Sequence, residues 1–600
     1  MRDEEDDEAH WKHYEARSGA TGVQAAILAP TGSSFASRSA PTEEQKYNPY
    51  LYEMRGPVAS LAVRDLPIAE RKSPQEDVEE INPPRHEELF DENGNRYGTQ
   101  APTQPDRLAA QSAARTPSKQ TPALVVDFEG LDNINGVLPP DTEGAVGPSH
   151  YVQVVNSSFA VYDKSGALLA GPSDTNTLWS GFGGPCQVFN NGDAIFVYDQ
   201  PADRWVFSQF AVSSGNQDVC FAVSQTGDPT GAYWLYSVTT PRFPDYYKIG
   251  VWPDPANSAY FMGTNSGFGG EYDVAALDRD KMLAGVAARP MQVFQNHPNL
   301  LMPADVDGPN PPPADSPGVF YTFRDGGEPY FGNPPTDSLD IWEFDVDWAT
   351  PALSTFTQAQ TIRPAQGLAD FNWTVCGFFE SSCLPQPGSN PCNNFIGEDC
   401  LDSASWWPMQ RLQYRNFGTH ETLVGTWTVD TTAATPRSGH AAPRWFELRK
   451  AGSSWSIFQQ GTHAPDGDDR WMPSISMDGA GNIAIGYSKV NDATSLLPSI
   501  YYAVREAGDP LGTLQAEALH IAGGGIQTHS ANRWGDYSSM DVDPADDCTF
   551  WYTTEYMETT GSAPWQTRVG AFQVEGCAAP VVFRDGFESG DTSSWSSSTP

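Results

Sequence analysis

RWMPSISMD, residues 470–478, and RWGDYSSMD, residues 533–541, are two copies of one short pattern. Both begin with Arg-Trp and end with Ser-Met-Asp after the same four-residue spacing. A pattern that returns within one chain indicates a repeated structural unit before it indicates a catalytic motif. The sequence is therefore searched first for further units of the same kind.

Seven stretches share one outline, a short apolar strand, an Asp or Asn turn and a second strand, usually followed by a third. They begin near Asp141, Asp193, Asp245, Asp305, Gln410, Arg470 and Arg533. Most steps between them are about 50 to 65 residues, and the 54 Gly and 50 Pro argue against long helices. A ring of small sheets buries the faces that one small sheet would leave exposed. We predict an all-β fold, a β-propeller of seven blades, with six or eight as open alternatives.

The composition divides the chain into three regions. Residues 1–120 are rich in charge, Pro, Ser and Gln, and we expect a disordered or extended N-terminal pro-segment or arm. Residues 125–577 hold the propeller, with a Cys-rich insertion around 363–405 in the one long step between units. Residues 578–600 form a C-terminal tail.

The balance of charge limits the partners. The net charge is -41 and the pI is near 4.4, so we expect no nucleic-acid or anionic-membrane partner. No apolar run approaches the roughly 20 residues that span a bilayer. The start MRDEEDDEAHW lacks the features of a signal peptide, so either a signal has been removed or the protein is cytosolic, and the cysteines favour removal of a signal.

Eight cysteines occur without any CxxC pair, which favours disulfides in an oxidising compartment over a zinc or redox site. We predict Cys186 with Cys220 and Cys548 with Cys577. Two local pairs are expected among Cys376, Cys383, Cys392 and Cys400. The protein is accordingly expected to be secreted or at the cell surface.

Several motifs resemble those of a group of large secreted bacterial proteins of unassigned activity with a propeller-like repeat region. They include NINGVLPPDTEGAVGPSHYVQVVN, YDQPADRWVFSQF, DYYKIGVWPD and RWGDYSSMDVDP, and the resemblance covers about residues 125–577. SMDGAGNIAIGYS also resembles a degenerate Asp-box, the hairpin turn of sialidase-like propellers, without its final Trp. The resemblance implies location and fold more than chemistry.

Equivalent positions at the starts of the units should meet around the propeller axis. The candidate ligand-binding residues on this axial face are Asp141, Asp193, Asp245, Arg411, His420, His463, Arg470, His529, Arg533 and Asp536. Two structural readings stay open. Each His, which follows a Thr, can satisfy a turn carbonyl, and Arg470 and Arg533 can pair with carboxylates to lock blades together.

Asp-rich turns offer a possible calcium cofactor, since calcium binds six to eight oxygen ligands in flexible geometry. The candidate ligands are Asp305, Asp307, Asp466, Asp468, Asp543 and Asp546. None of these turns completes an EF-hand, and turn formation alone explains many Asp residues.

The functional prediction is a secreted, disulfide-stabilised propeller that binds a glycan, peptide or surface partner through its axial face. The alternative is a sialidase-like glycoside hydrolase acting on acidic glycans, with Arg411, Arg470 and Arg533 as a carboxylate clamp and Asp141, Asp193 or Asp536 as acid. A third possibility is a structural surface-layer component. Whether the chain is an enzyme stays open, because no G-x-S-x-G, HExxH or P-loop pattern occurs.

Overall fold

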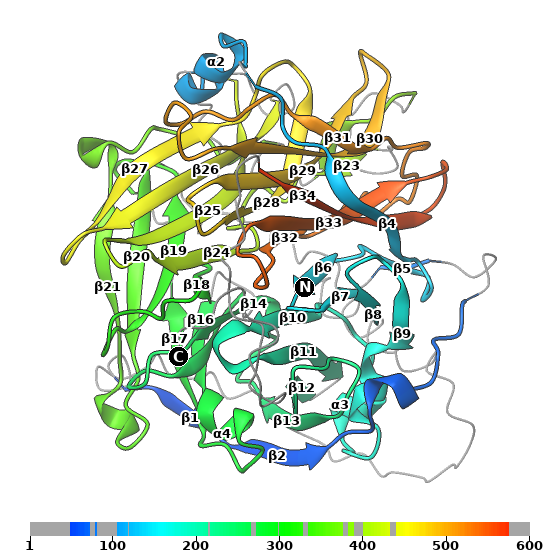
Figure 1. Cartoon of the computed structure of the whole chain (residues 1–600), viewed down its shortest axis with the longest axis vertical. Coiled ribbons are helices and arrows are strands. Elements are labelled where there is room, and N and C mark those ends of the chain that lie inside the picture. Colours follow the sequence, from blue (N-terminus) through cyan, green and yellow to red (C-terminus); the bar gives the residue numbers. More distant parts are fainter. Residues whose placement is uncertain are drawn as a thin grey trace, which may run out of the picture.

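A computed structural model describes residues 48–72, 78–80, 105–117, 119–213, 216–265, 272–297, 299–327, 334–375, 382–388, 400–432 and 440–574. The predicted tail at 578–600 lies outside these ranges. The prediction of an all-β fold is confirmed, because strands dominate the described residues and the longest helix, α2, spans only Arg107–Ala113. The architecture is propeller-like (Figure 1).

The described strands include seven antiparallel meanders of four strands. Meanders 1 to 3 are β6 (Glu143–Val146), β7 (His150–Val155), β8 (Ser158–Asp163) and β9 (Leu168–Asp174); β10 (Ile195–Asp199), β11 (Arg204–Ser213), β12 (Asn216–Ser224) and β13 (Tyr233–Thr239); and β14 (Asp245–Trp252), β15 (Ala259–Asn265), β16 (Tyr272–Leu277) and β17 (Met291–His297).

Meanders 4 to 7 follow the same plan. They are β18 (Met302–Asp307), β19 (Gly318–Arg324), β20 (Ser338–Asp345) and β21 (Thr355–Ile362); β24 (Leu412–Asn416), β25 (Glu421–Asp430), β26 (Ala441–Lys450) and β27 (Trp455–Thr462); β28 (Asp469–Met477), β29 (Ile483–Asn491), β30 (Leu496–Arg505) and β31 (Ala518–Ile521); and β32 (Ser539–Val542), β33 (Thr549–Met557), β34 (Trp565–Gln573) and β4 (Leu124–Asp132).

The first strands of the meanders surround a common centre (Figure 1). Each contacts the first strand of the next meander, from β6 through β10, β14, β18, β24 and β28 to β32, and β32 contacts β6. The seventh meander is completed by β4, which precedes β6 in the chain and pairs with β34. The N-terminal and C-terminal parts of the ring therefore share one sheet.

Side chains join neighbouring first strands where backbone pairing is missing. Asp305 Oδ1 accepts from Val251 N at 2.9 Å, which ties β18 to β14, and Ser539 Oγ donates to Gly144 O at 2.7 Å, which ties β32 to β6. Gln413 uses both ends of its amide on Met477, accepting from N at 2.6 Å and donating to O at 3.1 Å. Such bonds satisfy backbone groups that would otherwise be buried without a partner.

The two copies of the opening pattern lie in meanders 6 and 7 and pack against each other. Trp471 and Trp534 are fully buried with ring centroids 5.6 Å apart. The first copy lies in β28 from its first residue, Arg470, whereas the second passes through a loop before β32 begins at Ser539. The copies are thus a repeated structural unit.

N-terminal residues within the range predicted as an arm lie along the outside of the ring. Strand β2 (Met54–Ala59) adds to the outer edge of meander 2, and β1 (Tyr50–Tyr52) adds to the edge of meander 3. The short β3 (Glu79–Glu80) pairs with β5 (Val137–Leu138), next to the start of meander 1. Helix α2 is anchored by Asp106, which caps its N-terminus and accepts from Arg444 Nη2 at 2.7 Å.

The remaining short helices are α3 (Pro185–Val188), α4 (Arg279–Leu283) and the 3-10 turns η1 (Val63–Asp65), η2 (Thr175–Trp179), η3 (Gln200–Ala202), η5 (Pro351–Leu353) and η6 (Pro364–Gln366). In the part of the chain that the structure describes, none of the helices is long and apolar enough to span a membrane. Between β21 and β24, where the insertion was predicted, lie η6 and the hairpin of β22 (Ser382–Pro385) with β23 (Cys400–Asp402).

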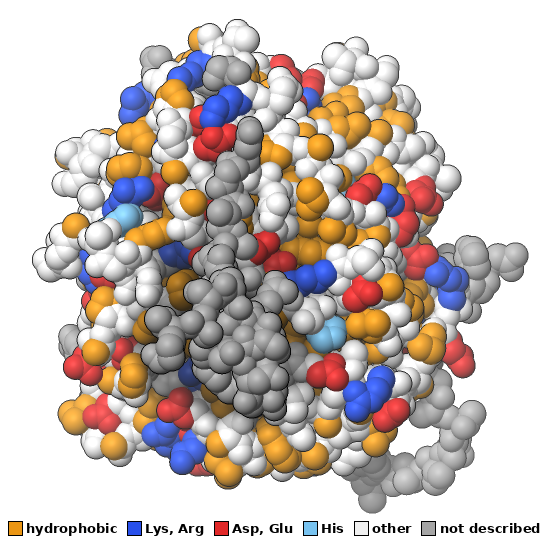
Figure 2. Space-filling view, in the orientation of Figure 1, with side chains coloured by type: hydrophobic (Ala, Val, Ile, Leu, Met, Phe, Trp, Pro, Cys, Tyr) orange, Lys and Arg blue, Asp and Glu red, His pale blue; other side chains and the backbone are white. Residues whose placement is uncertain are grey.

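One predicted disulfide is confirmed, Cys186–Cys220, which joins α3 to β12. Cys383, Cys400 and Cys548 are also disulfide-bonded, whereas Cys376, Cys392 and Cys577 lie outside the described residues. Figure 2 shows acidic, basic and hydrophobic side chains scattered over one face of the molecule.

Candidate functional site

The starts of several first strands carry charged side chains that meet at one end of the ring. We call this group the axial mouth, and it consists of Asp141, Asp193, Lys248, Arg533 and Asp536. Asp141, Asp193 and Asp536 have φ values of 47°, 43° and 65°, in the left-handed region that a residue with a Cβ rarely adopts. Strained backbone of this kind is often concentrated at functional sites.

The cation at the centre of the mouth is Lys248, on β14, which is fully buried. Its Nζ donates to Tyr247 O at 3.3 Å and lies over the rings of Tyr246 and Tyr537, 3.6 and 3.9 Å from their centroids. Burial lowers the pKa of Lys248 to about 8, although Asp193 and the other nearby carboxyl groups oppose this shift.

The acids of the mouth are crowded. Asp141 is 2 % exposed, and its Oδ1 has no hydrogen-bond partner among the described residues. Burial, together with the charges of Asp536 and Asp193, raises the pKa of Asp141 well above its usual range. The mouth therefore holds more carboxyl groups than cations.

Arg533 joins the mouth to two other segments. It donates to Asp536 Oδ1 at 2.5 Å and lies 3.8 Å from Asp402 Oδ2 and 3.5 Å from Glu80 Oε1. Burial raises the pKa of Asp402 to about 7 against the effect of Arg533. The hairpin β22–β23 and the N-terminal β3 thus each bring a carboxyl group to the mouth.

A row of aromatic rings leads into the mouth from the segment between β23 and β24. Trp406 and Trp407 are half-buried and stack with centroids 5.7 Å apart, and Trp407 stacks on Tyr246 at 5.6 Å. Tyr246 in turn covers Lys248 and donates through its hydroxyl to Asp536 O at 3.4 Å. Flat apolar rings therefore adjoin hydrogen-bonding acids.

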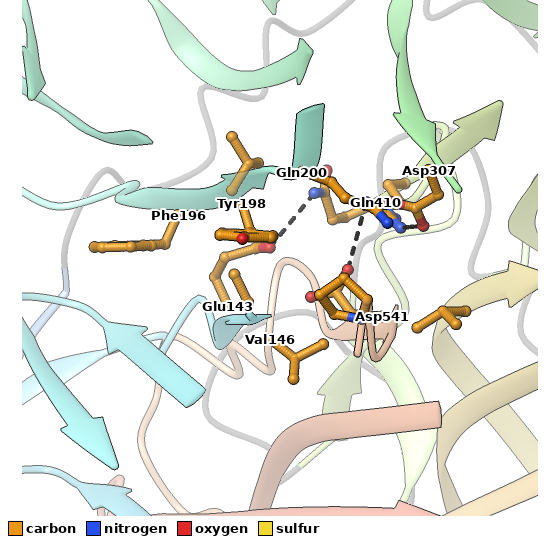
Figure 3. Close-up of a pocket in the computed structure, with 13 residues that line it drawn as sticks. Glu143, Val146, Phe196, Tyr198, Gln200, Asp307, Gln410 and Asp541 are labelled. Atoms are coloured by element: carbon orange, nitrogen blue, oxygen red, sulfur yellow. Dashed lines mark hydrogen bonds and ion pairs between the residues drawn. The ribbon is translucent and has the colours of Figure 1, made fainter. Parts of the chain in front are cut away.

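Deeper along the axis lies a second group, the axial floor, formed by Glu143, Asp307, Gln410, Arg411 and Asp541 (Figure 3). Arg411 pairs with Asp305 and Asp307 and lies 3.4 Å from Asp541 Oδ1. Gln410 Nε2 donates to Glu143 Oε1 at 3.4 Å. The cavity that these residues line has room of about 20 Å³, which is enough for one water molecule.

The acids of the axial floor also have raised pKa values. Burial raises the pKa of Asp541 to about 7 and that of Asp305 to about 6, against Arg411. Burial and the charge of Asp541 raise the pKa of Glu143 well above its usual range. The floor closes the axis with a compact network of acids around one arginine.

Other residues predicted for the axial face lie elsewhere. Arg470 is fully buried and forms a paired contact with Glu517, from Nε and Nη2 at 2.9 Å each, and His463 Nε2 lies 3.5 Å from the same carboxylate. His463 and Glu517 line a separate cavity of about 290 Å³, here called the rim cavity, beside α2 and meanders 5 and 6. Arg470 and His463 are thus together but apart from Arg533.

Three further candidates have local partners. His420 lies in the β24–β25 turn, stacked on Phe417 at 5.2 Å. Asp245 accepts from Asn265 Nδ2 at 3.1 Å across the β14–β15 pair. His529 precedes the second Arg-Trp copy, and its Nδ1 accepts from Ala531 N at 3.1 Å, so this bond satisfies a backbone N–H of the turn rather than the turn carbonyl that was expected.

The predicted calcium ligands lie against protein donors. Asp305 and Asp307 pair with Arg411, Asp466 with Arg470, Asp468 with Lys489 at 2.6 Å, and Asp543 with Lys164 at 2.5 Å, while Asp546 accepts from Cys548 N and Thr549 N. In the described ranges, no three His, Cys, Asp or Glu residues gather in a way that could hold a metal ion. Calcium binding stays a prediction.

Sequence reasoning missed Lys248, Glu143, Asp541 and Trp407. Glu143 and Lys248 follow predicted unit starts by two and three residues, and Asp541 ends the second repeat copy, so the period could have pointed to them. Trp407 had no such signal, because it lies in the segment that departs from the repeat.

No family model matches the chain, and no curated protein matches it in sequence. Among solved structures, an ulvan lyase of family PL25 is 10% identical, with 76% of this chain and 96% of that chain covered and a TM-score of 0.33. A GH43 beta-1,3-galactosidase is 10% identical, covering 77% and 93%, with a TM-score of 0.26. Drosophila plexin A in complex with semaphorin 1b is 7% identical, covering 77% and 89%, with a TM-score of 0.34. Likenesses at this level carry no argument about what the chain does.

Proposed function

We propose that the chain is a secreted seven-bladed β-propeller that binds a glycan at its axial mouth. The seven meanders and the unbroken series of contacts between their first strands support seven blades. The disulfide Cys186–Cys220 supports an oxidising compartment.

The observation that carries the glycan is the row of rings from Trp406 through Trp407 to Tyr246, beside the acids of the mouth. Sugar rings have apolar C–H faces that pack on aromatic rings, and equatorial hydroxyls that donate to carboxylates. A platform of half-buried indoles, joined through Tyr246 to the acids of the mouth, offers both kinds of contact.

Hydrolysis along the axis finds less support. The floor has room for about one water molecule, which is too little for a sugar ring. Each arginine of the predicted clamp already pairs with carboxylates of the protein, so none would be free for a substrate carboxylate. Binding at the mouth is therefore the better-supported function.

The test is a screen of neutral and charged oligosaccharides, followed by titration calorimetry on the best ligand. Trp407→Ala should weaken its affinity by up to about tenfold, because an aromatic pair is worth about 0.5–1.5 kcal/mol beyond the area that it buries. Trp348→Ala is the matched control, since Trp348 is also half-buried but packs beside Arg289, away from the mouth. Equal affinities in both variants, or no glycan bound by the wild type, would refute the proposal.

A further inference from the structure

The charge of the axial mouth bears on which glycan it would accept. Carboxyl groups of Glu80, Asp141, Asp193, Asp402 and Asp536 surround two cations, Lys248 and Arg533. The acids come from five separate parts of the chain: the arm, the starts of meanders 1, 2 and 7, and β23. The excess of acids is therefore a property of the assembled site.

We propose that the mouth is specific for a cationic glycan, one that carries free amino groups such as a glucosamine oligosaccharide, and we rest this on the proposed function. Asp141 Oδ1, in a side chain 2 % exposed, has no hydrogen-bond partner among the described residues and belongs to this acid group. An ammonium group supplies both the charge and the hydrogen bonds that such an oxygen lacks.

The surroundings of Lys248 show that the mouth accommodates an ammonium. Its Nζ lies within 4 Å of two tyrosine ring centroids, in the arrangement by which aromatic faces attract cations. Trp407 extends the row of rings from Tyr246, whose hydroxyl donates to Asp536 O, and the side chain of Asp536 is 21% exposed. A second ammonium, on a sugar stacked there, would meet an aromatic face and a carboxylate together.

The protonation of the site agrees with this assignment. Burial raises the pKa of Glu80 even beside Arg533, and burial with the charges of Asp536 and Asp193 raises that of Asp141. Both groups also lie near the negative charge of Asp536, which a bound cation would offset. The net charge of -41 adds a general attraction for cations and a repulsion of acidic glycans.

The aromatic row favours a glycan over a basic peptide, because stacked indoles present flat surfaces that match successive sugar rings. The experiment therefore compares four probes of matched length at mildly acidic pH, where the amines are charged. They are oligomers of glucosamine, of N-acetylglucosamine, of a uronic acid and of lysine. Calorimetry on the full chain measures each affinity, at low and at high salt.

The expected order is glucosamine above N-acetylglucosamine above uronate, with about a tenfold preference for the amine that shrinks in high salt. Glu80→Gln and Asp536→Asn should each reduce the preference for the amine over the N-acetylated oligomer severalfold. Glu80→Gln is the safer variant for folding, since its side chain is 25% exposed. Asp345→Asn, on the exposed end of β20, is the remote control.

Each alternative result is informative. Equal affinity for the amine and its N-acetylated form would overturn the charge preference and leave glycan binding intact. Tight binding of the lysine oligomer with none of the sugars would assign the mouth to a basic peptide. Failure of all the sugars and of the peptide would overturn the proposed function itself.

Discussion

The two Arg-Trp copies lie in neighbouring meanders, yet their arginines have different surroundings. Arg470 is enclosed by Glu517 and Asp466 within its own meander and its approach loop. Arg533 stands at the axial mouth among carboxyl groups from distant segments. What the copies share builds the ring, and of the four positions that differ, Pro473 against Asp536 gives Arg533 a carboxylate partner at the axial mouth.

The tryptophan is common to both copies, and its replacement should give the largest effect on stability. Trp471→Ala and Trp534→Ala should each lower the free energy of unfolding by about 3–5 kcal/mol, because each leaves a cavity in the core. The two rings touch, so the double variant should lose less than the sum of the single losses. Chemical denaturation of all four proteins measures this, and strict additivity would show that the copies do not support each other.

The arginine is also common to both copies, but its surroundings differ between them. Arg470→Ala and Arg533→Ala should each cost about 3–5 kcal/mol at neutral pH, since each leaves buried carboxylates without their cation. Their pH dependence should separate them. Although burial alone would raise it, hydrogen bonds from His463 and Arg470 hold the pKa of Glu517 well below its usual range.

The sign follows from linkage. The contribution of Glu517 is fully present above its unfolded pKa, near 4.5, so the loss in Arg470→Ala should persist from pH 8 down to about 5. The pKa of Asp402 is raised to about 7 in the folded protein, so this acid takes up a proton as the pH falls through 7. The loss in Arg533→Ala should therefore shrink below about pH 7. Thermal unfolding of both variants between pH 5 and 8 measures these losses. A loss that changes with pH in the same way in both variants would contradict the expected difference.

The fold could be predicted from the sequence because the period of the repeated units is visible in it. The predicted starts at Asp141, Asp193 and Gln410 each precede a first strand by two residues, and Asp245 begins β14 itself. Asp305 falls within β18, three residues after its first residue, Met302. Repetition marks strands well, because every meander must bury the same faces.

The site was harder to predict because its partners come from outside the period. Glu517 lies 47 residues after Arg470, on the segment leading to an outer strand, and its pairing could not be read from spacing. Glu80, Asp402 and Trp407 belong to the arm and the insertion, where no repeat aligns them with the axis. Three-dimensional closure of the ring was needed to bring these groups together.

The serines between the copies should give a smaller effect. Ser474 Oγ accepts from Met540 N at 2.9 Å, and Ser538 Oγ donates to Met472 O at 2.8 Å. Ser474→Ala should cost about 1–3 kcal/mol, because it leaves a buried N–H without an acceptor. Ser538→Ala should cost about as much, since it removes the donor to Met472 O and the acceptor of the Tyr552 hydroxyl at 3.2 Å. The exposed Ser456→Ala is the control in urea denaturation, and a loss in either buried variant no larger than in this control would contradict the expectation.

The smallest effect concerns the third position of each copy, where Met472 and Gly535 both have positive φ, 51° and 75°. Gly535→Ala should cost about 1–2 kcal/mol, because a Cβ in the left-handed region is disfavoured. The new Cβ would also lie 3.1 Å from Met472 Cγ, so the flexible methionine must shift. In the double variant with Met472→Ala, the contact with the methionine should be absent. The remaining loss of stability should then come from the left-handed backbone conformation alone. Gly508→Ala, where a Cβ meets open space, is the control, and a loss at Gly535 no larger than at Gly508 would show that the two copies do not share this backbone constraint.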